Sequence, residues 1–107
     1  MKYFPESNAD IEVIIKNNRP SKSNICSGYR PAFKVKDDYL TTGIIKLINC
    51  DVLSYGEQSV AEIWFITPEI YPSCLEVGQK IQFQEGKLNH GFIIITKINN
   101  KMLEKNK

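Results

Sequence analysis

The feature that most constrains this chain is a series of short segments rich in β-branched and aromatic residues, separated by turn-forming residues. No segment repeats apolar residues at helical spacing over three turns. The pattern predicts strands at residues 11–16, 32–36, 42–48, 60–67, 80–84 and 91–98. We therefore expect an all-β domain, and six strands of this length suit a small closed barrel.

The alternation of side chains differs between the predicted strands. In residues 80–84, Ile81 and Phe83 share one face and polar residues take the other, so this strand has one solvated face. In residues 60–66 both alternating sets are largely apolar, which predicts a strand covered on both faces or one that exposes a binding patch. Trp64 lies in this segment, and we expect it in the core in preference to an exposed interface.

Length and cysteine content limit the class of protein. A chain of 107 residues has room for a single domain, with the barrel at about 10–98 and a flexible polar tail at 99–107. Cys26, Cys50 and Cys74 are too far apart for a paired-cysteine metal site, and their odd number favours a reducing cytosol. The first residues lack a signal-peptide pattern and no apolar run could cross a bilayer, so we expect a soluble cytoplasmic protein.

Two separate regions of the chain are similar to the third, C-terminal domain of elongation factor Tu. The first is the run Gly-Tyr-Arg-Pro-Ala-Phe at residues 28–33, and Thr42-Gly43 follows it at the expected place. The second is Glu85-Gly86 followed by Gly91 and by Ile-Ile-Thr-Lys-Ile at residues 94–98. The resemblance runs from about residue 10 to 98, and it implies a six-stranded antiparallel Greek-key barrel.

The resemblance also implies a binding surface. Elongation factor Tu is a GTPase that delivers aminoacyl-tRNA, and its third domain contacts the T-arm backbone and the exchange factor. Carried over by position, the T-arm surface falls on Tyr29, Ala32, Thr42, Gln84, Glu85 and Gly86. Ala32 replaces a family glutamine and Gln84 replaces a family arginine, which removes an amide and a phosphate-pairing cation.

Further residues extend this candidate surface. Arg19 and Lys22 lie near the place of a family arginine-histidine pair. Arg30 follows Tyr29, and the two either pack within the barrel or clamp a ribose-phosphate backbone. The stretch 69–77 is longer than its family counterpart, and it carries Ile70 and Tyr71 as a candidate protein interface.

The sequence offers no group for catalysis. It lacks a Gly-rich loop ending in Gly-Lys-Ser or Gly-Lys-Thr, so we expect no GTP, no other cofactor and no metal. His90 precedes Gly91, and we expect an ordinary hairpin-turn residue without a carboxylate partner. A structure with His90 hydrogen-bonded to a carboxylate in a deep pocket would favour an enzyme instead.

These observations predict a non-enzymatic binding module that contacts a translation-related protein or the tRNA backbone, as a mimic of the full factor. A net charge of +2 and the partial loss of the T-arm surface favour the protein partner over tRNA. The alternative is an immunity or antitoxin protein that neutralises a toxin directed at the translation apparatus.

Overall fold

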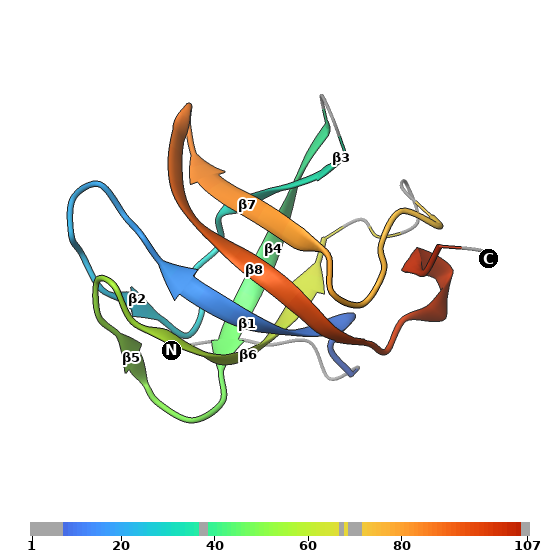
Figure 1. Cartoon of the computed structure of the whole chain (residues 1–107), viewed down its shortest axis with the longest axis horizontal. Helices are drawn as coiled ribbons and strands as arrows, with labels where there is room; N and C mark the ends of the chain where they lie inside the picture. Colours follow the sequence, from blue (N-terminus) through green and yellow to red (C-terminus); the bar gives the residue numbers. More distant parts are fainter. Residues whose placement is uncertain (1–7, 37–38, 67, 69–71, 106–107) are drawn as a thin grey trace.

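The computed structural model describes residues 8–36, 39–66, 68 and 72–105 (Figure 1). Six strands close a barrel, and the element order gives their bounds as β1 (Ile11–Asn17), β3 (Ala32–Lys36), β4 (Tyr39–Leu47), β6 (Gln58–Phe65), β7 (Lys80–Glu85) and β8 (Leu88–Ile98). The predicted all-β class and the six barrel strands are confirmed. The structure adds a two-stranded ladder of β2 (Ile25–Cys26) and β5 (Val52–Leu53), which are too short to give a periodic signal in the sequence.

Strand order explains how the chain closes on itself. The barrel order is β1-β6-β4-β3-β7-β8, and β8 pairs with β1 to complete the ring. All neighbouring barrel strands are antiparallel. The connections from β1 to β3 and from β6 to β7 join strands that are not neighbours, so they cross the barrel ends in a Greek-key manner. Closure leaves the barrel without a free sheet edge.

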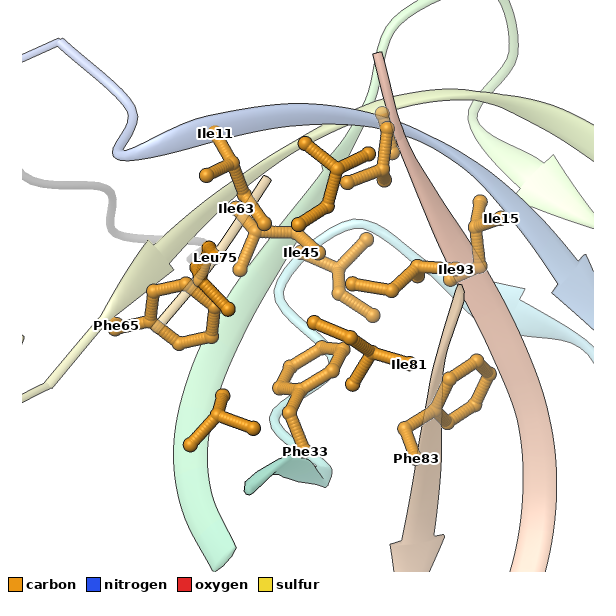
Figure 2. Close-up of a cluster of buried hydrophobic side chains, with 14 of the residues drawn as sticks. Ile11, Ile15, Phe33, Ile45, Ile63, Phe65, Leu75, Ile81, Phe83 and Ile93 are labelled. Atoms are coloured by element: carbon orange, nitrogen blue, oxygen red, sulfur yellow. The ribbon is translucent and has the colours of Figure 1, made fainter. Parts of the chain in front are cut away.

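Side chains from every second position of the strands point into the barrel and form the core. The burial of β1 alternates strictly, with Ile11, Val13 and Ile15 fully buried. Figure 2 shows that isoleucines from several strands meet the aromatic rings of the core, and Phe33 and Phe83 pack with their centroids 5.9 Å apart. Removing one such side chain from water stabilises the fold by about 1.5–3 kcal/mol.

Gly43 in β4 shows why one core position has no side chain. A Cβ atom there would lie 2.8 Å from the Phe33 ring and 3.0 Å from Ile63. Gly43 therefore serves the close packing of β4 against the core.

The C-terminal segment differs from the expected polar tail. Residues 101–103 form a 3-10 turn, η2 (Lys101–Leu103), and Leu103 is fully buried in the core. The backbone of Leu75 donates to the Leu103 carbonyl at 2.8 Å, and Lys105 donates to the Leu75 carbonyl at 2.7 Å. Burial of one leucine therefore joins the described part of this segment to the domain. No helix in the described ranges is long and apolar enough to span a membrane.

Candidate functional site

Residues from distant parts of the sequence meet beside β3. Ala32 pairs with Thr42 of β4 on one side and with Gln84 of β7 on the other. Tyr29 and Arg30 immediately precede β3, and Glu85 follows Gln84 at the end of β7. The register thus brings together most of the surface that the resemblance implied. In Figure 1 the ends of β1 and β7 lie on the same side of the barrel.

A buried asparagine positions Arg19, which follows β1. Asn17 is fully buried, and its Nδ2 donates to the carbonyls of Ser23 and Leu53 at 2.9 Å each. Its Oδ1 accepts from the Arg19 backbone N–H at 3.0 Å. The Arg19 guanidinium then donates from Nη1 to the carbonyl of Asn24 at 2.7 Å. These contacts hold both the backbone and the guanidinium of Arg19.

Glu85 joins the arginine to the only histidine of the chain. Its Oε2 atom lies 3.3 Å from Nη2 of Arg19 and 2.9 Å from Nδ1 of His90. The Nε atom of Arg19 is buried and has no hydrogen-bond partner among the described residues.

His90 does not occupy the hairpin turn that the sequence suggested. It lies within β8 and is buried, and the β7–β8 register shifts there, with Gln84 opposite Asn89 and Phe83 opposite Gly91. His90 is thus the extra residue of a β-bulge, a feature that re-aims a side chain. The expectation that it has no carboxylate partner is wrong, because the partner, Glu85, comes from the opposing strand.

Tyr29 connects this charged group with the core. Its ring packs edge-on against Phe83 with centroids 6.2 Å apart, and the Arg19 guanidinium carbon lies 5.0 Å from the Tyr29 centroid. The hydroxyl lies 3.3 Å from Nδ1 of His90. Burial raises the pKa of the Tyr29 phenol, and the negative charge of Glu85 raises it further, whereas Arg19 opposes the increase.

Polar and basic residues border this group. Arg30 is exposed, and so is Lys22, whose Nζ lies 5.9 Å from the centroid of Tyr55. Gly86 has a positive φ of 58°, and its carbonyl accepts from the side-chain amide of Gln84 at 2.6 Å. We call the set Arg19, Tyr29, Arg30, Thr42, Gln84, Glu85, Gly86 and His90 the Arg19 surface.

The predicted protein interface lies elsewhere. Trp64 of β6 is 8% exposed, and its neighbours Ile63 and Phe65 belong to the buried core cluster, whereas Trp64 does not. Its side chain is therefore buried as expected, although on the outer side of the strand. Val60 of the same strand is exposed, and so is Ile66, which follows the last residue of the strand. Ile70 and Tyr71 lie outside the described residues.

An open groove of about 490 Å³ lies apart from the Arg19 surface. Ile14, Val52 and Val60 supply apolar lining, and Cys50 and Glu57 add a thiol and a carboxylate. His90 does contact a carboxylate, that of Glu85. Neither residue lines this groove. Among the residues with described positions, no three His, Cys, Asp or Glu side chains gather as metal ligands would.

A scan of protein-family models finds no match to this chain, and a search of curated protein sequences finds none either.

Proposed function

We propose that this chain is a non-enzymatic binding module, related in form to the third domain of elongation factor Tu, whose partner contacts the Arg19 surface. One observation carries the proposal. Arg19, Tyr29, Thr42 and Glu85 are far apart in the sequence, yet strand register and side-chain contacts bring them to one side of the barrel. Loops and strand ends on a rigid scaffold are common positions for binding residues.

The charge of the surface favours a translation-related protein over the tRNA backbone. Phosphate binding depends on cations that are available to release counterions. Glu85 already pairs with Arg19, and Gln84 stands where the resembling family has an arginine. Tyr29 and Arg30 supply an aromatic ring and a guanidinium, which are enriched at protein interfaces. A module of this kind would compete with the full factor for a shared partner.

The first experiment measures binding of the purified chain to the exchange factor of elongation factor Tu by calorimetry. We expect R19Q/Y29A to weaken binding by about tenfold or more, because anchors of this type dominate interfaces. K97Q is the matched control, since Lys97 is exposed and pairs only loosely with Glu12 at 3.9 Å. Equal binding by all three proteins would reject the Arg19 surface as the contact.

The second experiment is a mobility shift with tRNA at low and physiological salt. We expect weak binding that is lost at physiological salt. Tight binding at both salt concentrations, reduced by R19Q/Y29A and R30Q, would overturn the preference for a protein partner.

A further inference from the structure

The two side chains that contact Glu85, those of Arg19 and His90, are more firmly held than Glu85 itself. The His90 side chain is 9% exposed and that of Arg19 is 19% exposed, whereas that of Glu85 is 46% exposed. Asn17 and the Asn24 carbonyl fix Arg19 at both ends, and the bulge fixes His90. Arg19 and His90 therefore form a preorganised site, and the exposed carboxylate of Glu85 is its occupant.

Glu85 also lies where its side chain can move away from Arg19 and His90. It is the last residue of β7, and the turn that follows begins with Gly86 in a left-handed conformation. Arg19 and His90 contact the same carboxylate oxygen, Oε2, at 3.3 Å and 2.9 Å. An ion pair this exposed contributes little net free energy, so a competing anion could displace it.

We infer that Glu85 occupies, in the free protein, a carboxylate site that an acidic side chain of the protein partner takes over on binding. The inference rests on the proposed function, because it concerns the same surface. The site places the Nη2 group of Arg19, which donates to Glu85, and the Nδ1 atom of His90 beside the incoming carboxylate. The buried Nε of Arg19 adds a donor that no described residue uses.

A carboxylate fits the exchange better than a polyphosphate backbone does. When one carboxylate replaces another, Arg19 and His90 again contact a group of the same charge. A nucleic-acid strand would bring a row of negative charges past the displaced Glu85, which stays tethered beside the site.

The test uses the whole chain with Glu85→Ala and acetate as the probe, with chloride holding the ionic strength constant. The chain has one histidine, so a histidine-labelled sample gives a single set of imidazole NMR resonances. We expect acetate to shift the His90 resonances of E85A saturably toward their wild-type positions. Wild type and E76A should show little change, because a carboxylate lies beside the imidazole in both, whether it belongs to Glu85 or to acetate.

E76A is the matched control because Glu76 is also an exposed carboxylate in an ion pair, 3.5 Å from Lys105. The double variant R19Q/E85A should lose the acetate response, since one donor is gone. No saturable shift in E85A, or an equal shift in R19Q/E85A, would overturn the inference. Inorganic phosphate that saturates E85A at lower concentration than acetate would also overturn it, in favour of a nucleic-acid backbone.

The partner adds a separate measurement. E85A should bind an acidic partner with a dissociation constant roughly two- to fivefold lower than wild type, because the internal competitor is removed. Weaker binding by E85A would contradict the exchange. The acetate titration needs this chain alone, so it stands or fails independently of whether the exchange factor binds.

Discussion

The Nδ1 atom of His90 lies 2.9 Å from Oε2 of Glu85, and a β-bulge in β8 makes this contact. A regular ladder would continue the alternation of faces along the strand. The extra residue interrupts that alternation at His90, and the imidazole is buried beside the end of β7. The pair is therefore a property of strand register as much as of the two side chains.

Truncation of His90 should destabilise the domain. In H90A the buried imidazole is lost together with its hydrogen bond to the Tyr29 hydroxyl and its close contact with Glu85, and we expect the free energy of unfolding to fall by about 1–3 kcal/mol. Urea denaturation measures this change. K105A, which breaks the exposed pair with Glu76, should cost no more than about 0.5 kcal/mol. Similar values for both variants would show that the buried contact adds nothing.

Two glycine substitutions separate backbone strain from steric overlap. Gly91 has a φ of 144°, and a Cβ there would overlap the carbonyl oxygen of Lys16 and meet the Phe83 ring at 2.7 Å. We expect G91A to destabilise by more than about 3 kcal/mol. At Gly86, with a φ of 58°, a Cβ would meet nothing within 4 Å, so G86A should cost about 1 kcal/mol. Thermal or urea unfolding that ranks them in the opposite order would contradict the bulge geometry.

The phenol of Tyr29 should ionise only at strongly alkaline pH. Burial and then the charge of Glu85 raise its folded-state pKa above the ordinary value of 10.0. The protonated phenol is thus favoured in the folded state, and its contribution to stability is complete below pH 10 and is lost as pH rises toward the folded-state pKa. The difference in tyrosinate absorbance between wild type and Y29F follows this titration. A component that ionises near the ordinary value would disprove the burial effect.

The C-terminal segment should contribute to stability through a single leucine. Leu103 is 0% exposed and Met102 is 43% exposed. We expect L103A to lower the free energy of unfolding by about 2–5 kcal/mol, because it leaves a cavity in the core. M102A should change it by less than about 0.5 kcal/mol. Equal stability of the two variants, measured by urea denaturation, would show that residues 99–105 are a peripheral tail that does not stabilise the domain.

The sequence by itself determined the fold class and the positions of the barrel strands. Alternation such as Ile81 and Phe83 in β7 is a local property, because successive side chains of a strand point to opposite faces. Gly43 and Gly86 were named from the sequence only through the resemblance, and the structure shows that Gly43 allows close packing and Gly86 a left-handed turn.

Only the tertiary structure decided the composition of the site. Arg19 and Glu85 are 66 residues apart, and their contact depends on the barrel order and on the bulge at His90. A register shift adds one residue to one strand without any periodic signal in the sequence, so neither the partner of His90 nor its burial was predictable. The packing of Leu103 was missed for the same reason: one buried side chain in a polar segment has no pattern, and its place depends on which distant residues surround it.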